Sequence, residues 1–102
     1  MRRLMIVYTL VEGTDEHQAI EALQKTQEQL PEGAFQQLCR RNEKDMDQQL
    51  RWMPFGDLVQ IIDFQKASEA ENFDDSSAAI AQRRRCRGMF SNSAAISCTV
   101  VD

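Results

Sequence analysis

Two segments of the chain are apolar at both odd and even positions. Residues 4–11 place Leu, Ile, Tyr and Leu on one parity and Met and Val on the other, and residues 58–64 place Leu, Ile and Phe opposite Val and Ile. Successive side chains of a strand point to opposite faces of the sheet, so a strand of this kind is covered on both sides. The pattern predicts two central strands of one sheet.

Apolar residues at helical spacing predict two helices. Thr14 or Asp15 can accept hydrogen bonds from the free N–H groups of the first helix, which ends near Pro31. A cluster of aspartate and serine residues precedes the second helix, which is expected over residues 78–90. The alternating residues 96–101 then predict a half-buried closing strand.

The centre of the chain fits more than one assignment. Residues 34–46 can begin a strand, but we favour a helix because four apolar side chains recur at helical spacing, namely Phe35, Leu38, Cys39 and Met46. Residues 48–53 and 58–64 flank a Pro–Phe–Gly–Asp turn and predict a β-hairpin whose more polar first arm suits a sheet edge. A short helical or irregular connection is expected over residues 66–73.

The expected order of elements is β, α, β, β, α, β, which is the split βαβ pattern of ferredoxin-like folds. We predict one α+β domain over residues 1–102, with a four-stranded antiparallel sheet and both helices on one face. Because the helices cover only that face, the other face keeps an apolar patch larger than monomers usually expose. We therefore expect a homodimer that packs through the helix-free face.

Charge, hydropathy and cysteine content exclude several classes of protein. The 102 residues carry a formal charge of −4, which repels phosphate backbones, so nucleic acid is not an expected partner. The longest apolar run, within residues 4–10, is far shorter than the ~20 residues that span a bilayer. With no cleavable signal after Met1, we expect a cytoplasmic protein without a membrane partner. The three cysteines have no pairing pattern and His17 is the only histidine, so we expect reduced thiols, no metal and no cofactor.

Polar residues in the apolar segments are the candidates for a site. Tyr8, Gln60 and Asp63 interrupt the two central strands, and Trp52 lies in the first arm of the hairpin. A buried polar group is costly unless it is hydrogen-bonded, so each of these residues needs a partner. Arg83 lies on the apolar stripe of the second helix, whereas its neighbours are expected to face water, namely Arg84, Arg85 and Arg87.

We expect a small-molecule pocket between sheet and helices that is lined by Tyr8, Trp52, Gln60 and Arg83. The rings would pack against an apolar ligand, Gln60 would supply a hydrogen bond, and Arg83 would meet a carboxylate, phenolate or enolate. Tyr8 and Gln60 share a parity, whereas Asp63 lies on the opposite side of its strand, so these residues cannot all line one pocket. An acid–base site at Asp63 is the alternative. In a third interpretation these residues only fill the core or an interface.

Several features of the chain together carry a resemblance to a known superfamily. They are the apolar first strand with its Glu12–Gly13 turn, the Leu50–Met53 arm before Gly56–Val59, and a second helix that ends in Met89–Phe90. In these the chain resembles the dimeric α+β barrel superfamily, in particular its small antibiotic-biosynthesis-monooxygenase-like proteins. The resemblance implies two ferredoxin-like protomers packed sheet against sheet.

The resemblance does not select one reaction, because the superfamily includes cofactor-free oxygenases, isomerases, haem-degrading enzymes and proteins without known activity. Haem-degrading relatives ligate iron through a histidine on the second helix, and residues 76–90 contain none. An enzyme of this kind is then expected to be cofactor-free and monooxygenase- or isomerase-like. The alternative is a non-catalytic assembly or regulatory protein that uses its sheet face and arginine-rich helix as contact surfaces.

Overall fold

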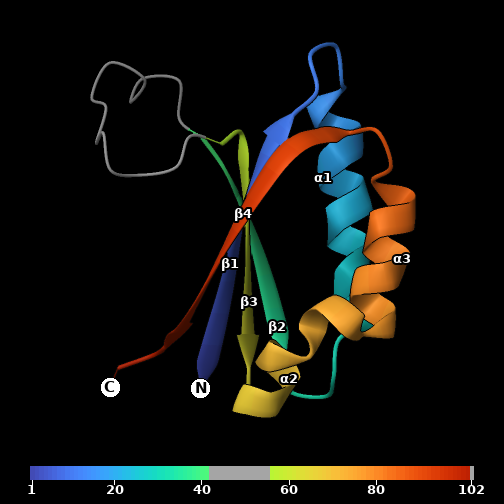
Figure 1. The fold of residues 1–102 in the computed structure, drawn as a ribbon. Helices are drawn as coiled ribbons and strands as arrows, with labels where there is room; N and C mark the ends of the chain where they lie inside the picture. Colours follow the sequence, from blue (N-terminus) through green and yellow to red (C-terminus); the bar gives the residue numbers. More distant parts are fainter. Residues whose placement is uncertain (42–55, 102) are drawn as a thin grey trace.

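The computed structural model describes residues 1–41 and 56–101, which form a four-stranded antiparallel sheet with helices on one face (Figure 1). This is the predicted ferredoxin-like α+β architecture. The strands and α-helices follow the chain as β1 (Arg2–Leu10), α1 (Glu16–Gln24), β2 (Phe35–Arg40), β3 (Leu58–Phe64), α2 (Ala67–Glu71), α3 (Ser77–Arg85) and β4 (Phe90–Thr99). The described residues also form 3-10 helices at Lys25–Gln29 and Phe73–Asp75.

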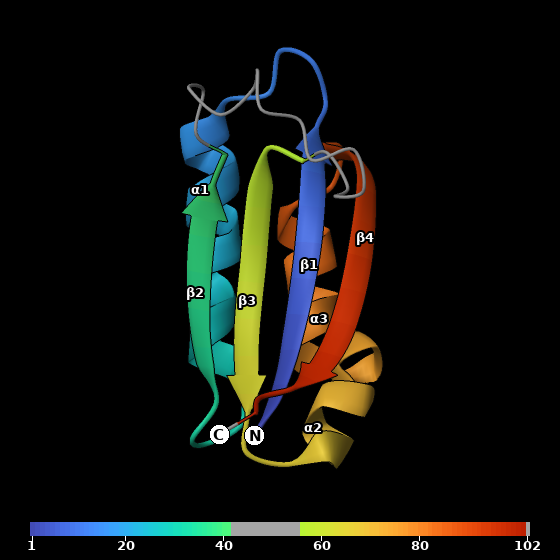
Figure 2. The same ribbon diagram turned by 90° about the vertical axis from the view of Figure 1, so that its left-hand side faces the viewer.

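The strands lie in the order β2-β3-β1-β4, so β1 and β3 are central (Figure 2). This confirms the prediction made from their apolar residues at both parities. The register between β1 and β3 sets Ile6 opposite Gln60, and that between β1 and β4 sets Ile6 opposite Ala95. Side chains directly opposite each other across two strands share a face. The even positions of both central strands therefore point to the same side.

The helix favoured for residues 34–46 is wrong, because Phe35–Arg40 form the edge strand β2. β2 pairs along the whole of β3, with Phe35 opposite Asp63 and Arg40 opposite Leu58. Both edges of β3 are thus occupied by β1 and β2, which contradicts the predicted hairpin between residues 48–53 and β3. Residues 48–53 themselves lie outside the described residues. Backbone pairing with β3 overrides the short stripe of helical spacing here.

The helices begin where the capping residues predict, but they are shorter than expected. Asp15 caps α1 by accepting a hydrogen bond from the His17 N–H at 2.9 Å, and Ser76 caps α3 by accepting from the Ala79 N–H at 3.2 Å. α3 ends at Arg85 rather than near Phe90, and Phe90 is instead the first residue of β4. The early start of β4 follows from its pairing with all of β1, where Leu10 lies opposite Phe90.

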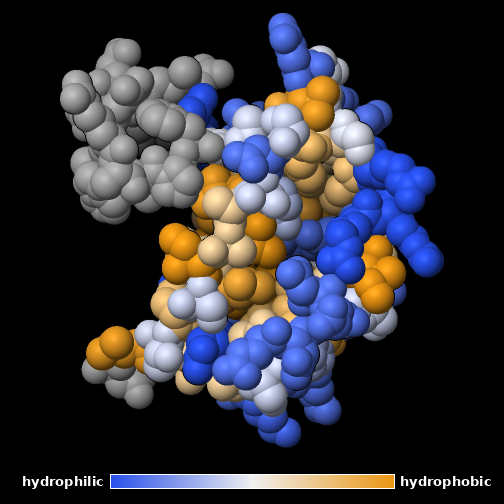
Figure 3. All heavy atoms as spheres, viewed as in Figure 1, coloured by the Kyte–Doolittle hydropathy of each residue, from blue (hydrophilic) through white to orange (hydrophobic). Residues whose placement is uncertain are grey.

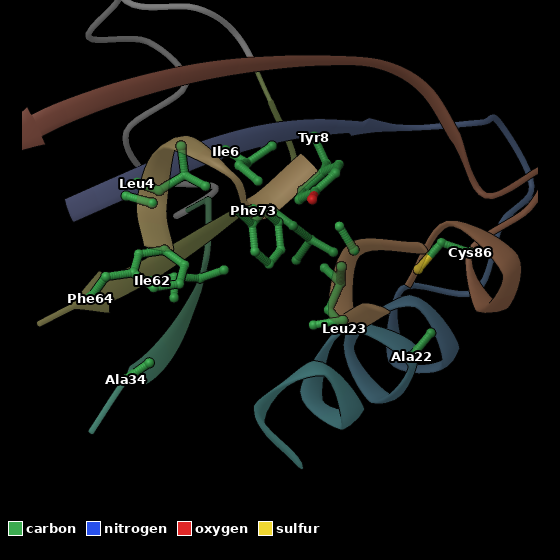
Figure 4. Close-up of a cluster of buried hydrophobic side chains, with 14 of the residues drawn as sticks. Leu4, Ile6, Tyr8, Ala22, Leu23, Ala34, Ile62, Phe64, Phe73 and Cys86 are labelled. Atoms are coloured by element: carbon green, nitrogen blue, oxygen red, sulfur yellow. The ribbon is translucent and has the colours of Figure 1, made fainter. Parts of the chain in front are cut away.

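The core lies between the sheet and the helices. Even-numbered side chains of the central strands pack there against α1 and α3, and Figure 4 shows Leu4, Ile6, Ile62 and Phe64 on the sheet side with Leu23 opposite. Phe73 lies in the middle of this cluster, with its ring centroid 5.9 Å from that of Phe64.

The helix-free face of the sheet carries the odd positions of the central strands and the outward side chains of the edge strands. It is lined by Met5, Val7, Phe35, Val59, Ile61 and Ile96. Phe35 is 65% exposed and Ile96 is 56% exposed. In Figure 3, hydrophobic atoms gather on the sheet side of the molecule and hydrophilic atoms over the helices.

Among the described helices, none is long and apolar enough to cross a membrane.

Candidate functional site

A pocket of about 580 Å³ lies between α3 and β4 and opens to solvent. This volume falls within the range of small-molecule sites, roughly 300–1,000 Å³. We name its buried lining the floor, which consists of Ile6, Tyr8, Phe73, Ala79, Gln82 and Cys86. We name its exposed lining the rim, which consists of Asp74, Arg83, Ser91, Asn92, Ser93 and Ala95. Phe90 lies between the two and stacks on Tyr8 with ring centroids 4.4 Å apart.

Tyr8 and Gln60 meet beneath this pocket, as their shared parity predicts. The Tyr8 hydroxyl donates to Gln60 Oε1 at 2.7 Å and accepts from Gln82 Nε2 at 2.7 Å. Gln60 Nε2 donates to Gln36 Oε1 at 2.6 Å and to Gln82 Oε1 at 2.7 Å. Four polar side chains from β1, β2, β3 and α3 are therefore joined inside the core.

Two further side chains extend these contacts to the helical layer. Thr26 donates its hydroxyl to Gln82 Oε1 at 2.6 Å and accepts from Arg85 Nη2 at 3.0 Å. Arg85 Nε also donates to the Ala22 carbonyl at 3.0 Å. We call the whole set the glutamine network, which comprises Tyr8, Thr26, Gln36, Gln60, Gln82 and Arg85. Such a network stabilises a core only when all of its members are paired, as they are here.

Arg83 lies at the rim of the pocket rather than inside it. Its side chain is 58% exposed. Nη2 donates to the Asp74 carbonyl at 3.0 Å, and Nη1 lies 3.9 Å from the Asp74 carboxylate, which is itself 93% exposed. An exposed ion pair at this distance contributes little binding energy. The guanidinium is therefore held at the mouth of the pocket by weak contacts.

The prediction that Arg84, Arg85 and Arg87 all face water is wrong for Arg85. Arg84 and Arg87 are exposed, but Arg85 is half-buried and reaches across to α1 and Thr26. Its long apolar stem allows the charged group to leave the solvent-facing side of α3 and to pair with backbone oxygen. No pattern within the run of arginines distinguishes it, because the partner oxygens come from a different helix.

Asp63 does not belong to this pocket. Its carboxylate faces the helix-free side and accepts two hydrogen bonds from the Arg3 guanidinium, at 2.8 Å and 3.0 Å. The hydrogen bonds from Arg3 hold the pKa of Asp63 below its usual value. A carboxylate of lowered pKa is a weaker base, so this geometry does not support the alternative of a general base at Asp63.

The remaining predicted residue, Trp52, lies outside the described residues. The sequence analysis missed Gln82 as a pocket residue, together with Thr26 and Gln36 as its support. Gln82 has a readable signal, since it lies four residues after Ala78 and four before Cys86 on the buried side of α3. Gln36 has no such signal in the sequence until residues 35–40 are recognised as a strand.

The floor holds its titratable groups in their neutral forms. Burial raises the pKa of the Tyr8 hydroxyl well above its ordinary value, and burial likewise raises the pKa of the Cys86 thiol. Both groups therefore keep their protons at neutral pH. In residues 1–41 and 56–101, no three His, Cys, Asp or Glu side chains gather to hold a metal ion.

Solved structures with the same arrangement of strands and helices come from bacteria and plants. A dimeric ferredoxin-like protein of unknown function from Thermobifida fusca has a TM-score of 0.73 at 14% identity, over 97% of this chain and 90% of that one. A DABB family protein from Mesorhizobium loti has a TM-score of 0.66 at 14% identity, over 99% and 97% of the two chains. The Arabidopsis thaliana protein At3g17210 has a TM-score of 0.68 at 8% identity, over 100% and 97%.

No protein-family model matches the sequence, and no curated protein does. The likeness to solved structures extends over nearly the whole of each chain, at identities that show the fold alone. The chain has the ferredoxin-like fold that these solved structures share.

Proposed function

We propose that this protein binds a small, largely apolar anion in the pocket between α3 and β4. One observation carries the proposal, which is the combination of a buried, mostly apolar floor with an exposed guanidinium at the rim. Small-molecule sites usually combine an apolar lining with a few polar groups that orient the ligand. Tyr8 and Phe90 supply stacked rings for the apolar part, and Arg83 supplies the cation.

Arg83 suits this role because its contacts with Asp74 are solvent-exposed and weak, so that a ligand can replace them. A carboxylate that enters the pocket can accept two parallel hydrogen bonds from the planar guanidinium, which an ammonium group cannot offer. Ser93 lies on the same rim and is directly opposite Tyr8 in the register of β1 and β4. Its exposed hydroxyl lies on the side of the sheet where the polar end of a ligand would lie.

Binding is better supported than proton-transfer catalysis. A monooxygenase- or isomerase-like reaction without a cofactor needs a base or acid whose pKa lies near neutral pH. Tyr8 and Cys86, the titratable groups of the described floor, both have raised pKa values. Asp63, the carboxylate on a central strand, points away from the pocket and is paired with Arg3.

We further propose that two copies pack through the helix-free face. Phe35 and Ile96 are more than half exposed there, and the half-buried Met5, Val7, Val59 and Ile61 lie between them. Solved structures of the same fold are described as dimeric in Thermobifida fusca and Bacteroides fragilis. A second copy buries the apolar face and leaves the pocket, on the helical side, open to a ligand.

The ligand proposal is tested by calorimetric titration with 2-naphthoate and with the neutral 2-naphthylmethanol. We expect Arg83→Gln to weaken 2-naphthoate about tenfold or more, because hydrogen bonds to charged groups contribute roughly 1.5–3 kcal/mol, and to leave 2-naphthylmethanol nearly unchanged. Arg84→Gln is the matched control, since Arg84 is exposed on the same helix and does not line the pocket. Equal effects of the two substitutions on 2-naphthoate, or no binding at millimolar ligand, would refute the proposal.

A further inference from the structure

Each donor and acceptor of the glutamine network has a defined orientation, because both ends of the network are chemically fixed. An arginine side chain can only donate and a backbone carbonyl can only accept. Arg85 Nη2 lies 3.0 Å from Thr26 Oγ1 at one end, and Gln36 Nε2 lies 3.0 Å from the Leu23 carbonyl at the other. The orientation of every hydroxyl and amide between these ends follows from them.

The chain of donors can be followed from Arg85 inward. Thr26 Oγ1 accepts from Arg85, so its own hydrogen points to Gln82 Oε1 at 2.6 Å. The Nε2 group of Gln82 then faces Tyr8 and Gln60, and donates to the Tyr8 hydroxyl at 2.7 Å and to Gln60 Oε1 at 3.3 Å. The Tyr8 hydrogen is directed to Gln60 Oε1 at 2.7 Å.

In this orientation the strong hydrogen-bond donors among the floor side chains are already paired within the network. Both hydrogens of Gln82 Nε2 and the hydrogen of the Tyr8 hydroxyl have partners inside the network. Among the polar side chains of the floor, one lone pair of the Tyr8 oxygen and the weakly donating Cys86 thiol then remain. A carbonyl or carboxylate oxygen buried at the floor would lose its hydrogen bonds to water without replacement.

We propose that the pocket selects anions whose inner end is hydrocarbon and rejects those whose inner end carries a carbonyl or carboxylate oxygen. This inference rests on the proposed function and names the ligand class of the same site. The anionic head lies at the rim with Arg83, and the apolar end lies on Tyr8, Ile6 and Cys86. Arg85 is a positioning residue for this selectivity, since it acts through Thr26 and Gln82 without lining the pocket.

The test compares 6-isopropyl-2-naphthoate with 6-acetyl-2-naphthoate. These anions have nearly equal shapes, and in the second a carbonyl oxygen takes the place of one methyl group of the isopropyl group. We expect the isopropyl compound to bind at least about fivefold more tightly to the wild-type protein in calorimetric titrations, because an acceptor that is buried without a donor loses its hydrogen bonds to water. Equal affinities would overturn the selectivity and leave the proposed binding function standing. If neither compound binds, the proposed function itself fails.

Tyr8→Phe provides a second arm, because removing the hydroxyl leaves one Gln82 N–H without its acceptor. We expect the preference for the isopropyl compound to fall by about fivefold or more, since the floor then offers a donor to the acetyl oxygen. Ser93→Ala is the matched control, because it also deletes a hydroxyl from the pocket lining but from the rim. An unchanged preference in Tyr8→Phe, or an equal fall in Ser93→Ala, would overturn the role assigned to the network.

Discussion

Gln60 is a neutral amide that is completely buried in the middle of the sheet, on the face that packs against the helices. Burying an amide without partners is costly, and a glutamine side chain can donate two hydrogen bonds and accept two. Gln60 makes all four, with Tyr8, Gln36 and Gln82. Its side chain therefore fixes the position of three neighbours from three different elements.

We expect Gln60→Met to lower the free energy of unfolding by about 2–4 kcal/mol, because a side chain of similar volume then leaves the Tyr8 donor and a Gln36 acceptor unpaired in the core. Urea unfolding measures the loss. Gln18→Met, at an exposed position of α1, is the control and should change the stability by no more than about 0.5 kcal/mol. Similar losses in the two variants would contradict the structural role of the network.

Single residues show what the sequence can and cannot predict about this site. Strand parity correctly sets Tyr8 and Gln60 on one face and Asp63 on the other, because the alternation of side chains is a local property of a strand. The burial of Arg85 and its contact with Thr26 depend on how α3 packs on the helical segment Lys25–Gln29. Such a contact between distant segments leaves no pattern in the run of arginines.

The strands β1 and β3 are joined on the helix-free face by the ion pair of Arg3 and Asp63, whose residues lie directly opposite in the register. Cross-strand pairs of opposite charge stabilise a sheet. Because Arg3 lowers the pKa of Asp63 in the folded state, the pair stabilises the protein above the unfolded pKa of Asp, about 4, and this contribution disappears as the pH falls through the lower folded value.

We expect Asp63→Asn to be less stable than the wild type at pH 7, with a difference that shrinks as the pH is lowered from about 5 to 2. Urea unfolding across this pH range measures it. Arg3→Gln should give the same pH dependence, and the double variant should add little to either single one, since both remove the same pair. A difference that stays constant down to the lowest pH would show that the ion pair is not its cause.

At the level of elements, the central strands and the capped helix starts were predictable, whereas β2 was not. Apolar residues at both parities identify a strand with neighbours on both faces, and Asp15 and Ser76 cap helices through contacts within three residues. Gln36 and Gln37 instead give residues 35–40 no clear alternation. This segment is a strand because β3 has a free edge for it, which the local sequence does not report.

The molecule as a whole has two unlike surfaces on opposite sides of one sheet. The helical side holds the α3–β4 pocket and the exposed arginines Arg84 and Arg87. The other side of the sheet carries mainly apolar side chains (Figure 3). An apolar face of this kind on a small protein marks an association surface. The proposed homodimer uses it and keeps both pockets accessible.

We expect the wild-type protein to have twice the mass of the 11.7 kDa chain in sedimentation equilibrium at micromolar concentration. Ile61→Asp places a charge on the helix-free face beside Met5 and should shift the protein toward monomer, because an unpaired charge is costly to bury at an interface. Ile80→Asp, at an exposed position of α3, is the matched control and should remain dimeric. A wild-type protein of monomer mass would contradict the dimer.

The central claim, that the α3–β4 pocket binds an apolar anion, is tested most directly by isotope-filtered nuclear Overhauser spectra of the labelled protein with unlabelled 6-isopropyl-2-naphthoate. The isopropyl methyl protons should give cross-peaks to the Tyr8 ring and to Ile6, and the aromatic protons should give cross-peaks to Phe90, which are all pocket-lining residues. Cross-peaks to Met5, Ile61 and Ile96 on the helix-free face, with none to Tyr8, would contradict the claim.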